Sequence, residues 1–174
     1  MATFLEHIHQ AKQNIQFLSD VNARINSQWD WQVTVSFYVA VHLVNAHIVQ
    51  KSDNHYRSHE QVNNVLNPYN ILSVSKLPEA IYLAYVKLQN LSRRARYLCS
   101  DNPDERTASA FHTSEKYFAK AVRELDKVIS YFDQLYNLAL AKIDLNCLRL
   151  KEDNLNFFTY KSSLEQRCEY PVPQ

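Results

Sequence analysis

The chain of 174 residues contains no glycine. Glycine makes up about 7% of an average protein, because it supplies the positive-φ positions of tight turns, bulges and phosphate-binding loops. Glycine-rich nucleotide-binding loops are therefore excluded, and folds rich in β-hairpins are disfavoured because their two-residue turns prefer glycine. Helical bundles need few such positions, so the absence of glycine favours an all-α fold.

The chain also lacks an excess of charge, a cysteine framework and a long apolar run. Nineteen Lys and Arg face eighteen Asp and Glu, so any basic site must be local. Cys99, Cys147 and Cys168 lie far apart and in no metal-ligand spacing, which predicts reduced thiols in a cytoplasmic protein. No run approaches the roughly 18 apolar residues that span a membrane, and the amino-terminal residues soon turn polar. We expect neither a signal peptide nor a membrane-inserted segment.

The sequence shows clear helical periodicity. Apolar residues three and four positions apart predict a first helix over about 3–25, with Asn22 interrupting its apolar face. The stretch 29–50 is apolar on nearly all sides, which predicts a helix packed between several others. That helix should be the most buried element of the fold.

A capping residue and a proline predict two further helices. Ser58, with Gln61 three residues later, is typical of the start of a helix, here over 59–66. Pro78 suits the first turn of another helix, which continues to about Tyr97. The stretch 100–105, with Pro103, then breaks the helical pattern.

The last predicted helix is long, beginning near Thr107. Its apolar face alternates steps of four and three residues, through Phe118, Val122, Leu125, Ile129, Phe132, Tyr136, Ala139 and Ile143. We interpret this seam as part of the intramolecular bundle, and the alternative is that its distal part packs on a second protomer. The prediction is thus an all-α, antiparallel up-and-down bundle of four to five helices over 1–150. The tail, 151–174, should attach loosely, although its aromatic residues are available to dock.

Three segments of the chain form a recognisable set: FYVAVHLVNAHI at 37–48, YRSH at 56–59 and LSRRARY at 91–97. Together they resemble the HEPN superfamily of helical domains found with nucleotide-binding proteins. The matching positions are Tyr38, Ala40, His42, Ala46, His59, Leu91, Arg94, Ala95 and Tyr97. Arg96 stands where an acidic residue is common in those relatives, which makes this surface more basic. The resemblance covers roughly 1–140 and implies an HEPN-like bundle.

HEPN proteins that cut RNA carry an Arg, four to six residues and then a His near the start of the last core helix. Arg106 and His112 are similar to that pair. The implied chemistry is metal-independent: the ribose 2′-OH attacks the adjacent phosphate, Arg stabilises the charge that develops and His moves the proton. Residues six apart on a helix are about 120° apart, so the pair converges only if Arg106 precedes the helix or two copies meet. Thr107 replaces the Asn or Asp that often follows this Arg in active relatives.

A second candidate site is the cluster Arg93, Arg94 and Arg96 at the end of a predicted helix. Three Arg there interact favourably with the helix dipole, which is the plainer interpretation. The alternative is a phosphate or nucleic-acid site, with Tyr97, Tyr85 or Tyr82 for base stacking and Arg57 and His59 nearby. The histidines lack neighbouring Cys or carboxylate ligands at suitable spacing, so we predict no metal and no cofactor.

Three functions remain open from the sequence. We favour a non-catalytic HEPN-like module, homodimeric, that binds RNA, a nucleotide or a partner protein. The resemblance implies a cognate nucleotidyltransferase as one such partner, and a toxin–antitoxin or defence system as the setting. The alternative is a metal-independent endoribonuclease that uses Arg106 and His112 across a dimer. A third interpretation is a helical scaffold whose Arg cluster is used up in internal salt bridges.

Overall fold

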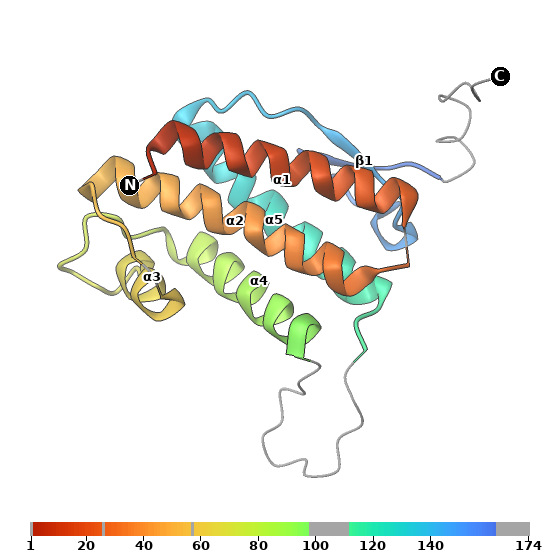
Figure 1. Ribbon diagram of the computed structural model, residues 1–174, viewed down its shortest axis with the longest axis horizontal. Helices are drawn as coiled ribbons and strands as arrows, with labels where there is room; N and C mark the ends of the chain where they lie inside the picture. The colour runs from red at the N-terminus through yellow and green to blue at the C-terminus, as the bar shows by residue number, and fades with distance from the viewer. Residues whose placement is uncertain (1, 26, 57, 98–111, 163–174) are drawn as a thin grey trace, which may run out of the picture.

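The computed structural model describes residues 2–25, 27–56, 58–97 and 112–162 (Figure 1). These residues form five α-helices, a short 3₁₀-helix and two short strands. In chain order they are α1 (Phe4–Arg24), α2 (Trp29–Ser52), α3 (His59–Leu66), α4 (Glu79–Tyr97), α5 (Glu115–Tyr136), β1 (Ile143–Leu145), η1 (Leu148–Leu150) and β2 (Phe158–Tyr160). The chain is therefore a mostly helical bundle, and the two strands were not predicted.

Helix α2 is the centre of the bundle, as predicted. It packs against α1, α4 and α5, and α4 and α5 also pack against each other (Figure 1). By length and composition α2 is apolar enough to cross a membrane, whereas we predicted no apolar run of that length. However, 67% of its most apolar window is buried inside the structure. Its composition is that of a core helix surrounded on several sides.

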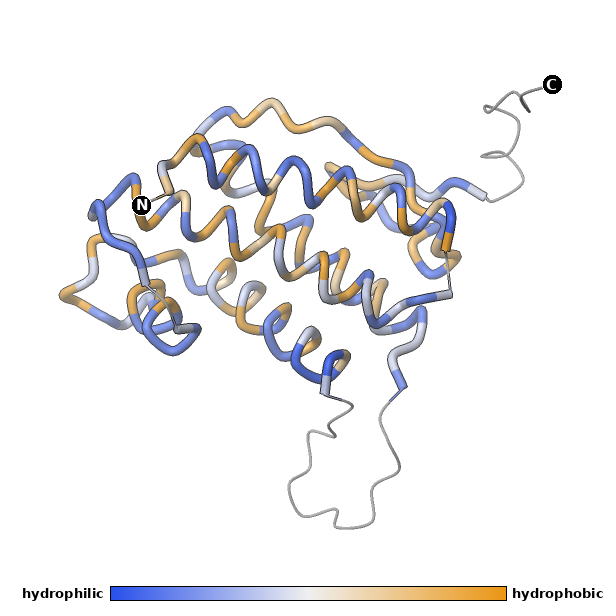
Figure 2. The backbone as a smooth tube through the Cα atoms, in the orientation of Figure 1, coloured by the Kyte–Doolittle hydropathy of each residue, from blue (hydrophilic) through white to orange (hydrophobic). Residues whose placement is uncertain are grey.

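Helix α1 begins with a capping box and carries one polar residue on its buried face. Thr3 accepts a hydrogen bond from the Glu6 amide, and the Glu6 carboxylate accepts one from the Thr3 amide. Figure 2 shows hydrophobic and hydrophilic residues alternating along α1, as expected of an amphipathic helix. Asn22, which interrupts the apolar face, is fully buried. Its side chain donates to Gln32 Oε1 at 2.8 Å and accepts from the Asn146 amide at 2.6 Å.

Helices α3 and α4 have the bounds that the sequence indicates. Ser58 caps α3 by accepting a hydrogen bond from the Gln61 amide. Pro78 directly precedes α4, and its carbonyl accepts bonds from the amides of Ile81 and Tyr82. The last turns of α4, at Tyr97, bring the Arg cluster to one end of the bundle.

Helix α5 is shorter than predicted. It ends at Tyr136, because Asn137 adopts the left-handed conformation with φ of 49° and its amide bonds back to the Asp133 carbonyl. Ala139 also has a positive φ, of 51°, and Ile143 lies in β1, so the seam does not continue through them. The distal helix that was to pack on a second protomer therefore does not form. The predicted start near Thr107 lies outside the described residues.

The segment after α5 turns back along the bundle instead of projecting from it. Strands β1 and β2 are parallel, with Ile143 opposite Phe158. Phe158 is 2% exposed and belongs to the core. Asp126 of α5 accepts hydrogen bonds from the amides of Asn156 and Phe157. The expectation of a loosely attached tail is therefore wrong for 151–162, because the chain there has both backbone and core contacts. The rest of the predicted tail, 163–174, lies outside the described residues.

Candidate anion-binding site

The three arginines at the end of α4 point to two different sides of the helix. Arg93 and Arg94 line a hollow between α4 and α5, whereas Arg96 lines a smaller one between α4 and α2. Successive helical residues are about 100° apart around the axis, so Arg94 and Arg96 are separated by roughly 200°. The Arg cluster seen in the sequence is therefore divided between two hollows on different sides of α4.

The hollow between α4 and α5 is strongly basic, and we call it the α4–α5 basic groove. It has a volume of about 360 Å³. Its lining consists of Lys87, Asn90, Leu91, Arg93, Arg94, Tyr117 and Lys120. Four of these seven residues are cations, and none of the described lining residues is a carboxylate. The groove thus concentrates positive charge on a chain whose formal net charge is only +1.

A buried carboxylate underlies one end of this groove. Glu124 of α5 forms ion pairs with Lys87 of α4 and with Lys127, the latter at 2.9 Å. Burial by itself would raise the pKa of Glu124, but the hydrogen bonds from Lys127 and Lys87 outweigh it and hold the pKa below its usual value. The charge of Glu124 is therefore balanced by the two lysines, and its ion pair with Lys87 links α5 to α4.

A lysine ammonium lies over the aromatic ring in the groove. The Lys120 ammonium lies 5.5 Å from the centroid of the Tyr117 ring, within cation–π range. Arg93 is exposed and Arg94 half-buried. Two guanidinium forks and two ammonium groups beside an aromatic ring suit a phosphate-bearing ligand, because guanidinium pairs with phosphate oxygens through two hydrogen bonds.

The other side of α4 brings Arg96 close to His59, a pair that the sequence suggested as neighbours. The pKa of His59 is lowered, first by burial and then by the charge of Arg96. The His59 ring also lies 5.4 Å from that of Phe37. Arg96 sits 5.3 Å over the ring of Tyr97. Arg57 lies outside the described residues.

One tyrosine proposed for base stacking is a core residue instead. Tyr85 is fully buried against Phe37, with ring centroids 5.8 Å apart, and burial raises its pKa. Tyr82 is half-buried, and Tyr97 is exposed. Of the three candidate stacking residues, Tyr97 has the most accessible ring.

The predicted ribonuclease pair of Arg106 and His112 stays a prediction, because only His112 is among the described residues. His112 is exposed in the extended residues before α5. Arg106 lies outside the described residues. Among the residues that are described, no group of three or more His, Cys, Asp or Glu side chains is arranged to hold a metal ion.

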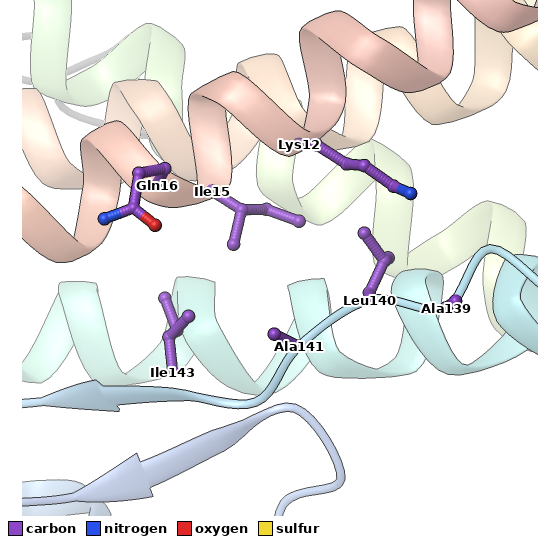
Figure 3. A pocket seen from close by; sticks show the side chains of 7 residues that line it. All are labelled: Lys12, Ile15, Gln16, Ala139, Leu140, Ala141 and Ile143. Atoms are coloured by element: carbon purple, nitrogen blue, oxygen red, sulfur yellow. The ribbon is translucent and has the colours of Figure 1, made fainter.

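A different hollow, between α1 and the chain after α5, is mainly apolar (Figure 3). Ile15 and Leu140 project into it, with Lys12 and Gln16 at its edge. Its volume is about 230 Å³. It offers one cation and no cluster of polar groups, so its chemistry is less specific than that of the basic groove.

Sequence reasoning missed four groove residues, Lys87, Asn90, Tyr117 and Lys120. Lys87 and Arg94 are seven residues apart and therefore share one face of α4. Tyr117 and Lys120 share a face of α5 in the same way. Helical spacing was thus a usable signal within each helix, but only the packing of α4 on α5 brings the two faces together.

Comparison with known proteins assigns the chain to no family. No protein-family model, curated protein or solved structure matches it. A function for the chain is therefore inferred from the geometry and charge of the α4–α5 basic groove.

Proposed function

We propose that the chain is a non-catalytic, HEPN-like module with an antiparallel up-and-down arrangement of helices, and that it binds the phosphates of RNA or of a nucleotide in the α4–α5 basic groove. The observation that carries the proposal is the convergence of four cations from two helices on one hollow. The HEPN relationship rests on the segments at 37–48, 56–59 and 91–97. A homodimer and a cognate nucleotidyltransferase are the partners that the resemblance suggests, and the widely spaced cysteines suggest a cytoplasmic location.

The charge balance around the groove supports an anionic ligand. Like charges held close together repel one another, so a cluster of cations is stabilised when an anion neutralises it. Glu124 does this for Lys87 and Lys127 at one end of the groove. No described carboxylate lines the part formed by Arg93 and Lys120. Phosphate binding there would release counterions and would weaken as salt concentration rises.

Binding of a fluorescent single-stranded RNA, measured at several salt concentrations, tests the proposal. Arg93→Gln combined with Lys120→Gln removes two groove cations and should weaken binding by about tenfold or more at low salt, with a shallower salt dependence. Lys76→Gln changes an exposed lysine of the α3–α4 loop and serves as the control. Equal binding by the double variant and the wild type would contradict the groove assignment.

The non-catalytic part of the proposal has its own test. The wild-type protein, incubated with a mixed RNA pool in EDTA, should leave the RNA intact, and His112→Ala should behave in the same way. Cleavage that appears with the wild type and disappears with His112→Ala would instead identify a metal-independent ribonuclease.

A further inference from the structure

Three large aromatic side chains of α2 and α4 are exposed. Trp31 and Tyr38 of α2 are 63% and 41% exposed, and Tyr97 of α4 is 64% exposed. The chain has only two tryptophans, and the other, Trp29, is half-buried with its ring 5.5 Å from that of Phe118. A large aromatic ring in water forgoes the stabilisation that burial brings, so a group of such rings marks a surface that contacts something else.

The two aromatic residues of α2 lie on the same face of that helix. Trp31 and Tyr38 are seven residues apart, which places them about 20° apart around the axis and about 10 Å apart along it. Trp31 lines the hollow between α2 and α4 together with Arg96 and Ala95. The aromatic surface formed by Trp31 and Tyr38 therefore has the Arg96 guanidinium, and also the Asp30 carboxylate, at its Trp31 end.

The aromatic surface and the α4–α5 basic groove flank the same two turns of α4. Arg94 faces the groove and Arg96 faces Trp31, although their backbone positions are only two residues apart. The amino-terminal turns of α2 and α5 also meet here, through Trp29 and Phe118. A ligand that crosses the end of α4 can thus reach cations on one side and aromatic faces on the other.

We infer that the ligand is a single-stranded nucleic acid, with phosphates in the α4–α5 basic groove and unpaired bases stacked on Trp31 and Tyr38. This inference rests on the proposed function and adds the strandedness of the ligand. In a duplex the base faces are covered by adjacent base pairs, so an aromatic side chain on a protein surface stacks only on bases that are unpaired. Arg96 completes the surface, because a guanidinium plane also stacks on bases.

Trp31 is also the reporter for the test. In a Trp29→Phe background Trp31 is the only tryptophan, and stacking on a base quenches indole fluorescence. A 12-nucleotide oligouridine should quench it, whereas an oligoadenine–oligouridine duplex of equal length should not. Trp31→Ala in the wild-type background should weaken oligouridine binding about tenfold and leave duplex binding unchanged. Trp31→Phe, which keeps an aromatic face, should restore most of the affinity, and Phe17→Ala removes a 54% exposed ring of α1 as the control.

The outcomes distinguish a failure of the single-strand inference from a failure of the proposed nucleic-acid function. Equal binding of single strand and duplex, with unchanged Trp31 fluorescence, would overturn the inference of single-strand recognition and leave the basic groove in place. Failure to bind either oligonucleotide would overturn the inference and the nucleic-acid function together. Equal losses of oligouridine affinity in Trp31→Ala and Phe17→Ala would contradict a specific role of the aromatic surface in binding.

Discussion

The Nδ1 atoms of His7 in α1 and His42 in α2 lie 3.2 Å apart. One imidazole must donate the hydrogen bond and the other accept it, so the contact requires at least one neutral ring. The ring of His55 lies on another side of His7, with centroids 5.5 Å apart. The pKa of His7 is lowered by burial and then by His42 and His55, while Glu6 opposes this, and burial lowers the pKa of His42.

This pair makes stability depend on pH in a defined direction. The unfolded chain takes up protons near pH 6.5, whereas the folded chain resists protonation of His7 and His42, so acid favours unfolding. We expect the free energy of unfolding to be level above about pH 6.5 and to fall as the pH drops below it. Urea unfolding across this range should show a weaker pH dependence in His42→Asn. His9→Asn, which alters an exposed histidine of α1, should keep the wild-type dependence.

His47 should add a second and larger pH effect. It is buried beside Tyr136, whose hydroxyl lies 2.7 Å from His47 Nδ1, and burial, followed by the charge of Lys51, lowers its pKa from 6.5 to about 4. A change of this size corresponds to roughly 3 kcal/mol of stability lost between pH 6.5 and 4. His47→Phe cannot titrate, so its unfolding free energy should fall less over that range. At pH 7 the variant should lose about 1 kcal/mol with the Tyr136 bond.

Replacing Asn22 by an apolar residue should destabilise the protein, although it would complete the apolar face of α1. Asn22→Leu leaves Gln32 Oε1 and the Asn146 amide without their partner in the core. We expect a loss of about 1–3 kcal/mol, measured by urea unfolding at pH 7.5. Gln13→Leu, on the exposed side of the same helix, should change stability by less than about 0.5 kcal/mol. A stabilised Asn22→Leu would contradict the role of this network.

Removing the charge of Glu124 should move stability and anion binding in opposite directions. Glu124→Gln deprives Lys87 and Lys127 of their counter-charge, so the groove becomes more positive. We expect tighter RNA binding at low salt and a loss of about 1–3 kcal/mol in unfolding free energy. Glu152→Gln makes the same charge change at an exposed site outside the groove lining. If both variants raise affinity equally, overall charge and not the groove is responsible.

Introducing glycine into this glycine-free chain should stabilise it at one position. Ala139 has a φ of 51°, where its Cβ is sterically disfavoured. Ala139→Gly should raise the unfolding free energy by about 1 kcal/mol, since glycine adopts this conformation readily. Calorimetry would show this as a higher melting temperature. Ala141→Gly, at a position without positive φ, should bring no such gain.

Local sequence patterns indicate where most helices form and which helix is central. Helical periodicity and caps are local properties, so the bounds of α1, α3 and α4 followed from spacing and from Ser58 and Pro78. The apolar character of α2 on all sides predicted its central place, because such a helix is stable only when others surround it. The basic cluster at the end of α4 was also visible in the sequence.

The end of α5 and the neighbours of each arginine depend on long-range packing and could not be predicted from local patterns. The heptad seam continues to Ile143, but the chain leaves the helix at Asn137 and pairs 143–145 with 158–160. That pairing depends on contacts between distant segments, among them the bonds of Asn22 and Asp126, which no local pattern contains. The groove likewise exists only where α4 meets α5, because a site built from two helices is set by how they pack.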